Sequence, residues 1–239
     1  MTGPPTSFTY DGDPVKTHLQ RCAPQPRVQS RSDSFFVYVM GPYTAFDASY
    51  AYPDAAALQS SFIEDPLFDP ETHPDTTGRE TYEAALAELC DDLRAEFGVR
   101  AFLATDIRTI PTKADAGPNE PGMSVLEQSI AFAACSDAVV FVFTNAGLTT
   151  GAGSEVGAIL GEFQLRRGHP REPLKPRQRI GIFQHEAFES ASIEEIPYTY
   201  GIGTREFATR PDLVDDIKGF LENVRREAQA GPLPKFHSY

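Results

Sequence analysis

The residues with the clearest chemical potential lie in a glycine-rich loop, TNAGLTTGAGSE, at residues 144–155. Its glycines are Gly147, Gly151 and Gly153, and its hydroxyl residues include Thr149, Thr150 and Ser154. Glycine lets a backbone approach a ligand closely. A helix is predicted to begin at about Ser154, so its free N–H groups and positive dipole end face the same space. The loop therefore predicts a cradle for a polar or anionic group.

Glu155 follows these glycines in the first turn of the predicted helix, where a carboxylate repels a bound phosphate. No Lys follows the loop, and the glycine spacing differs from that of a dinucleotide fingerprint, so it is neither a Walker A nor a Rossmann motif. Helix N–H groups favour an ionised carboxylate, which suits a nucleophile acting on a neutral or cationic carbon. A first-turn Glu also stabilises a helix without further function, and spacing alone leaves both interpretations open.

Strands and helices alternate along the chain. Continuous apolar runs predict strands over 35–40, 99–104, 138–143 and 179–183, and a short fifth strand around 205–208. Helical periodicity is found over 80–97, 124–135, 154–166 and from Pro211, with a short helix over 55–63. This alternation predicts an α/β fold, a three-layer sandwich with a mostly parallel sheet of about five strands. Ligands in such folds bind at the carboxyl ends of the strands.

Three short motifs fall in order around those strand ends. A strand ends in Gly-Pro-aromatic in VYVMGPY (37–43), and a strand opens with Asp in SDAVVFVF (136–143). A glycine-rich loop leads into Glu-x-Gly in TGAGSEVGAILGEF (150–163). Together they bracket roughly half of the chain. With these three motifs in this order, the chain resembles a divergent, haloarchaeal-type member of the nucleoside 2-deoxyribosyltransferase family.

The resemblance implies a flavodoxin-like (Rossmann-like) sheet, and cleavage or transfer of an N-glycosidic bond in a nucleoside, nucleotide or NAD-like substrate. In that family the Glu matching Glu155 attacks the anomeric carbon, and a nucleobase or water then takes the sugar with retention. Tyr43 matches an aromatic residue whose hydroxyl orients this Glu. Substrate contacts are expected from Gly41, Pro42, Asp47, Asp106, Thr149, Gly151, Gly153 and Ser154. No cofactor and no metal is implied.

Two acidic positions of that family differ here. Thr149 stands where the family usually has an Asp six residues before the Glu. Ser129, with Glu127 close by, stands where a helix carries a second Asp before the strand-opening Asp137. These differences put base exchange in doubt and leave hydrolysis open. Two alternatives also remain: a non-catalytic nucleotide sensor on the same fold, and an NAD hydrolase like the Toll/interleukin-receptor domains.

The acidic composition of the chain limits which kinds of molecule it is expected to bind. The 239 residues contain 34 acidic and 21 basic side chains, a net charge of −13, which disfavours binding to a nucleic-acid backbone. High negative charge with few lysines suits a halophilic cytoplasm, although ordinary acidic proteins share it. One basic run breaks the pattern: Arg166, Arg167, Arg171, Lys175, Arg177 and Arg179. It could meet a phosphate or an acidic neighbour, or form a solvated face. The expected partner is a small molecule, and the resemblance makes a homo-oligomer plausible.

The termini differ in composition from the rest of the chain. Residues 1–33 are rich in Pro, Ser, Gln and Arg, which predicts a poorly ordered arm or a segment lying on the surface. A single domain is expected over 34–230, followed by a loose tail over 231–239. No signal peptide and no run of about 18 apolar residues is present, so a cytoplasmic protein outside the membrane is expected. Cys90 and Cys135 lie in apolar helical patterns and are predicted to be buried.

Overall fold

The computed structural model describes residues 8–28, 35–41, 65–67, 79–118, 120–144, 153, 156–161 and 177–230, without the side chains of residues 79–82. Five parallel strands form the central sheet: β3 (Phe36–Met40), β4 (Arg100–Phe102), β5 (Ala138–Phe143), β6 (Ile180–His185) and β7 (Thr204–Phe207). Their order is β4–β3–β5–β6–β7. This is the flavodoxin-like order, and it confirms the predicted fold class.

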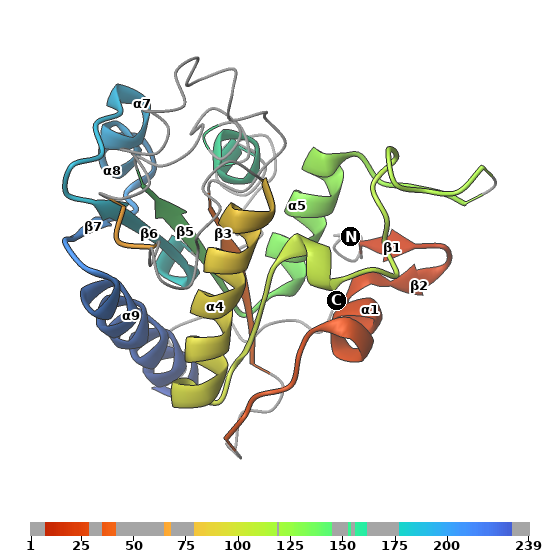
Figure 1. Ribbon diagram of the computed structural model, residues 1–239, viewed down its shortest axis with the longest axis horizontal. Coiled ribbons are helices and arrows are strands. Elements are labelled where there is room, and N and C mark those ends of the chain that lie inside the picture. Colours follow the sequence, from red (N-terminus) through yellow and green to blue (C-terminus); the bar gives the residue numbers. More distant parts are fainter. Residues whose placement is uncertain are drawn as a thin grey trace, which may run out of the picture.

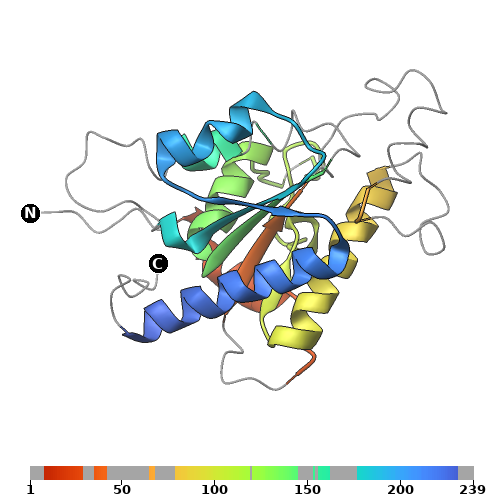
Figure 2. The ribbon, with the colours of Figure 1, turned by 90° about the vertical axis from the view of Figure 1, so that its left-hand side faces the viewer.

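Helices cover both faces of the sheet (Figure 2). One face carries α4 (Arg79–Phe97) and α9 (Arg210–Ala230). The other carries α5 (Val125–Cys135), the helical residues 156–161, and the short helices α7 (Ala191–Glu194) and α8 (Ile196–Tyr200). One 3₁₀ turn, Ala104–Asp106, follows β4, and another, Arg177–Arg179, precedes β6. The crossovers change faces once, between α4 and α5, and α9 returns to the face of α4, so the sheet has a helical layer on each side.

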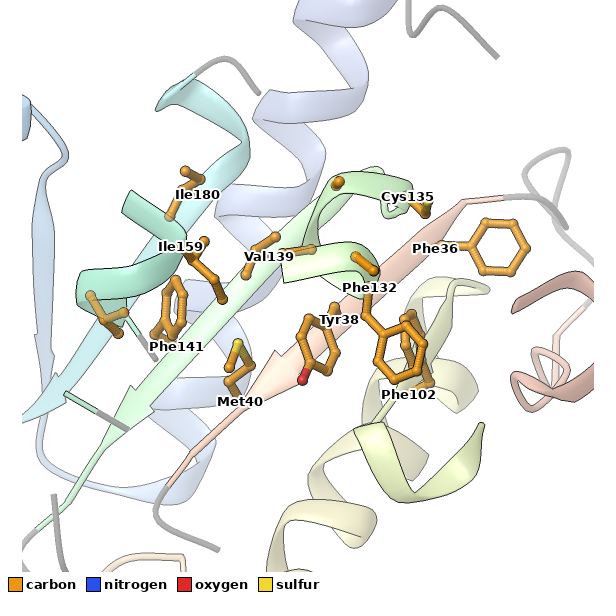
Figure 3. Close-up of a cluster of buried hydrophobic side chains, with 14 of the residues drawn as sticks. Phe36, Tyr38, Met40, Phe102, Phe132, Cys135, Val139, Phe141, Ile159 and Ile180 are labelled. Carbon is orange, nitrogen blue, oxygen red and sulfur yellow. The ribbon is translucent and has the colours of Figure 1, made fainter. Parts of the chain in front are cut away.

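Strand alternation divides the core into two apolar clusters. Side chains of Phe36, Tyr38 and Met40 on β3 face the α5 layer, where the Tyr38 ring meets Phe132 of α5 edge-on (Figure 3). Val37 and Val39 belong to the cluster beneath α4 and α9. Strands β3, β5 and β6 are buried along their whole length. The prediction from the continuous apolar runs, that these strands are covered on both faces, is therefore confirmed.

Local signals confirm two further predictions. Ser124 caps α5: the Glu127 N–H donates to Ser124 Oγ at 3.3 Å, and Glu127 Oε2 accepts from the Ser124 N–H at 2.9 Å. This is the capping box expected from the sequence. The buried Cys90 and Cys135 are also as predicted, and desolvation raises the pKa of the Cys90 thiol far above its usual range. The predicted helix over 55–63 lies outside the described residues.

The expectation of a poorly ordered N-terminal arm is wrong for residues 8–28. A hairpin of β1 (Thr9–Tyr10) and β2 (Asp13–Pro14) leads into α1 (Val15–Cys22), which packs against α5 (Figure 1). Val15 and Leu19 are fully buried in the cluster on that face. The buried Arg100 guanidinium donates to the carbonyls of Gln20 and Ala23, which holds the end of α1 to β4. The segment folds because these few apolar side chains complete the core.

No helix of the described residues combines the length and the apolar character that a membrane crossing needs. The predicted tail over 231–239 lies outside the described residues.

Candidate functional site

The sheet has one point at which its strand order reverses. The chain passes from β3 to β4 on one side and then returns to β5 on the other side of β3. The two crossovers run over opposite faces, through α4 and through α5. Such a reversal leaves a crevice beyond the carboxyl ends of the two strands, and ligands of open α/β sheets bind there. The candidate site is therefore the region beyond Met40 of β3 and Phe143 of β5.

β3 and β5 are direct neighbours at this point. Met40 pairs with Phe141 in the parallel ladder, so the two chains leave the sheet on adjacent strands, about 4.8 Å apart. In the sequence, β3 is followed by Gly41-Pro42-Tyr43, and β5 is followed by the glycine-rich segment that begins at Thr144. The two segments that the sequence analysis identified therefore follow neighbouring strands at the same edge of the sheet.

Gly41 closes β3 and is buried against α4. A Cβ built on this glycine would lie 2.8 Å and 2.9 Å from the two δ-carbons of Leu86. Contacts this short do not occur between real side chains, so a glycine lets α4 approach the end of the strand. The sequence analysis expected Gly41 to contact substrate; the described contacts give it a packing role.

Thr144 closes β5 and was not among the predicted site residues. Its side chain is fully buried, and Thr144 Oγ1 has no hydrogen-bond partner among the described residues. A buried hydroxyl without a partner costs free energy, so structures retain few of them, often at functional sites. It stands at the first position of the glycine-rich loop, directly at the crevice. A polar residue ending an otherwise apolar strand is the sequence signal that could have identified it.

His185 is a second residue that the sequence analysis did not identify. It ends β6, beside β5, and is 9% exposed. Its ring lies 5.7 Å from the ring of Phe207, and its Nδ1 has no hydrogen-bond partner among the described residues. The carboxyl edge of the sheet thus holds two buried polar groups, on neighbouring strands, whose partners are not found among the described residues.

Asp106 lies beyond β4, at the same edge of the sheet as Gly41. Its Oδ2 accepts a hydrogen bond from the Leu103 N–H at 2.8 Å and so stabilises the 3₁₀ turn. Burial is the largest influence on its carboxyl and raises its pKa, while the Leu103 N–H and Arg94 act in the opposite direction. Asp106 therefore organises the turn through one oxygen, and its predicted substrate contact stays a prediction.

The helix after the glycine-rich loop is described at Gly153 and over 156–161. Val156, Ile159 and Leu160 are buried in the apolar cluster on the α5 face, which fixes this helix against the sheet. A Cβ on Gly153 would have no neighbour within 4 Å, so packing does not require a glycine at this position.

Most of the predicted site residues lie outside the described residues. These are Pro42, Tyr43, Asp47, Thr149, Gly151, Ser154 and Glu155. The roles assigned to them therefore stay predictions. Among the described residues, no group of three or more His, Cys, Asp or Glu side chains is placed to hold a metal ion.

Asp137, Glu127 and Ser129, which the sequence analysis compared with acidic positions of the nucleoside 2-deoxyribosyltransferase family, have local structural roles. Asp137 binds the backbone of Phe36 at the amino end of the sheet, opposite the crevice. Glu127 belongs to the capping box of α5. Ser129 is buried within α5, at 2% exposure, where the resembled family has a carboxylate. These positions supply no second acid at the candidate site.

Comparison with known proteins gives a family but no activity. No curated protein and no solved structure matches the chain. One family model, described as a domain of unknown function (DUF7509), matches residues 20–237, which is most of the chain and includes the last residues of α1 and the whole five-stranded sheet. The chain therefore belongs to the DUF7509 family.

Proposed function

We propose that this protein cleaves or transfers an N-glycosidic bond of a nucleoside, nucleotide or NAD-like substrate, with the Glu155 carboxylate as nucleophile. The observation that carries the proposal is the pairing of β3 with β5 at the reversal of strand order. The sequences that lead to Tyr43 and to Glu155 therefore follow adjacent strands. The buried Thr144 hydroxyl, which has no partner among the described residues, supports a polar ligand there.

The proposed reaction has two displacements. The Glu155 carboxylate attacks the anomeric carbon as the C–N bond breaks, and the electron pair leaves with the base nitrogen, which takes up a proton. A glycosyl ester on Glu155 results. Water or a second nucleobase then attacks the same carbon and loses a proton, and the ester C–O bond breaks to return the carboxylate. Two inversions give overall retention, as in retaining glycosidases.

The active-site residues divide these steps between them. The Tyr43 hydroxyl orients the Glu155 carboxylate, and the backbone amides of 151–154 hold the substrate. Thr144 Oγ1 provides a hydrogen bond at the base of the crevice. Because a neutral nucleoside brings no charge of its own, these hydrogen bonds and apolar contacts carry its recognition, and the protein's net charge of −13 opposes it little.

A second candidate function is a non-catalytic nucleotide sensor. Ser129 favours it, because this buried hydroxyl of α5 stands where the resembled family has a carboxylate. A sensor binds its ligand at the same crevice and returns it unchanged, so its ligand stabilises the folded chain without turnover.

Incubation with 2′-deoxynucleosides, nucleotides and NAD in high-salt buffer, followed by chromatography, tests the proposal. We expect a released base, or nicotinamide from NAD. Glu155→Gln should lose about three orders of magnitude in rate while remaining folded. Glu194→Gln, an exposed change of the same type on α7, should leave the rate unchanged. Thermal stabilisation by a ligand that is recovered intact would support the sensor, and equal rates for the two variants would exclude Glu155 as nucleophile.

A further inference from the structure

A pocket of about 260 Å³ lies at the opposite edge of the sheet from the crevice. It is lined by residues that lead into β6 and β7 at their amino ends, and by Phe183 and Phe220. Arrowheads in Figure 2 point away from this edge. Ligands of open α/β sheets normally bind at the carboxyl edge. A pocket at the amino edge is therefore a separate site, independent of the proposed glycosidic reaction.

The charged groups of this pocket are all positive. Arg177 and Arg205 line it, and none of its described lining residues is acidic. Neither guanidinium forms an ion pair with the described residues, a property shared by Arg100, Arg225 and Arg226. What distinguishes Arg177 and Arg205 is that they line one pocket together in a chain of net charge −13. They are available to an anion from solution.

The Arg205 guanidinium is held in a fixed orientation. Its Cζ lies 5.7 Å from the ring centre of Phe183 and 5.7 Å from that of Phe220. Its Nη1 donates to the carbonyl of Asp216 on α9 at 3.0 Å. Stacking and one backbone bond leave further N–H groups free for a ligand. Because the side chain is already ordered, binding costs little of its conformational entropy.

Arg177 approaches the pocket from its rim. A Cβ built on Gly201 would lie 2.7 Å from Arg177 Nη1, so the guanidinium lies directly on this glycine. Gly201 has a φ of +65° and ends α8, which gives a second reason for glycine at this position. Arg177 itself is exposed to solvent. It is thus positioned at the mouth of the pocket and remains accessible.

Most of the other residues that line the pocket are apolar, and one of them carries a hydroxyl group. The buried side chains of Phe183, Phe220, Ile180 and Ile182 form an apolar floor, and Thr204 provides a hydroxyl. Gly203 is exposed, and a Cβ on it would meet nothing within 4 Å. The space beside Gly203 is therefore open. We propose that this pocket binds a small organic anion in which a phosphate or carboxylate group adjoins a flat apolar body.

Phenyl phosphate and benzoate are the probes, with inorganic phosphate and phenol as controls that lack the apolar body and the anionic group. Calorimetric titration of the full chain at constant ionic strength should give a Kd below about 1 mM for one of the two probes, and weaker binding for both controls. Amide shifts in NMR spectra should be largest at Gly203 and Thr204. The stronger probe identifies the anionic group.

Three variants locate the binding. Arg177→Gln removes a cation and Gly203→Val fills open space, and each should weaken binding about tenfold or more. Arg226→Gln removes an exposed charge elsewhere on α9 and should leave the Kd unchanged. All three positions lie at the surface, so circular dichroism should show native folding. No binding by either probe, an equal loss in Arg226→Gln, or shifts confined to residues near Thr144 would overturn the proposal.

Discussion

Asp137 joins the start of β5 to the start of β3 through two hydrogen bonds to Phe36. Its Oδ2 accepts from the Phe36 N–H at 2.9 Å, and its own N–H donates to the Phe36 carbonyl at 2.8 Å. The side chain thus completes the backbone pairing where the parallel ladder begins. It lies at the amino edge, away from the crevice, so the family-like Asp at this position aligns the two strands that carry the proposed site.

Asp137→Ala should therefore reduce stability and leave catalysis intact. The change removes the acceptor of the Phe36 N–H, and we expect the free energy of unfolding to fall by about 2 kcal/mol in urea titrations. The exposed Asp215→Ala on α9 should change it by less than about 0.5 kcal/mol. Glycosidic activity per folded molecule should equal that of the wild type. A loss of kcat at full folding would instead place Asp137 in the reaction.

Thr144→Val tests whether this hydroxyl, which has no partner within the described part of the chain, serves a ligand. Valine has nearly the same shape and removes a buried polar group, so the free energy of unfolding should rise by about 1 kcal/mol. The KM for the substrate that the base-release assay identifies should increase. Thr144→Ser restores the hydroxyl and should restore the KM. A clear loss of stability in Thr144→Val with an unchanged KM would show that the hydroxyl is needed by the protein itself.

Gly41 and Leu86 predict a coupled pair of substitutions. Gly41→Ala places a methyl group less than 3 Å from both δ-carbons of Leu86, and overpacking of this kind costs about 1–3 kcal/mol. Leu86→Ala alone should cost about 2–5 kcal/mol, because it opens a cavity in a fully packed cluster. The double variant should be destabilised by less than the sum of the two, since each relieves the other. Additive losses would contradict the close approach of α4 to Gly41.

Asp106 predicts a dependence of stability on pH. Its pKa is raised from 3.8, chiefly by burial, so the folded chain binds this proton more tightly than the unfolded chain. Its contribution to stability is therefore greatest below pH 3.8 and is lost as the pH rises through the raised value. Asp106→Asn cannot ionise and keeps an oxygen for the Leu103 N–H. The stability of the wild type minus that of the variant should become more negative from about pH 4 to about pH 7. A difference that does not change with pH would exclude this carboxyl as the cause.

The sequence predicted the sheet well because its strands are buried on both faces. A continuous apolar run such as Phe36–Met40 or Ala138–Phe143 must bury side chains on both faces of its strand, as the middle of a covered parallel sheet allows. The Ser124–Glu127 capping box marked the start of α5 for an equally local reason. Features that depend on a few local residues, or on one strongly apolar segment, were therefore found.

The N-terminal hairpin was missed although its signal is present. Asp11 and Gly12 both have positive φ, of 49° and 84°, and Asp-Gly between two extended pairs is typical of a tight hairpin turn. The proline-rich composition around it concealed this signal. Burial of Val15 and Leu19 against α5 depends on a partner more than a hundred residues away, which no local pattern reports. The role of Gly41 against Leu86 and the burial of the Thr144 side chain depend on distant residues in the same way.

Trapping of the covalent intermediate tests the central claim most directly. The wild type is mixed with the substrate found in the base-release assay, quenched in acid within a single turnover, and analysed by peptide mass spectrometry. We predict a glycosyl adduct on the peptide that contains Glu155, absent from Glu155→Gln and present in Glu194→Gln. Base release with no adduct on Glu155, or an adduct on another residue, would contradict the assignment of this carboxylate as the nucleophile.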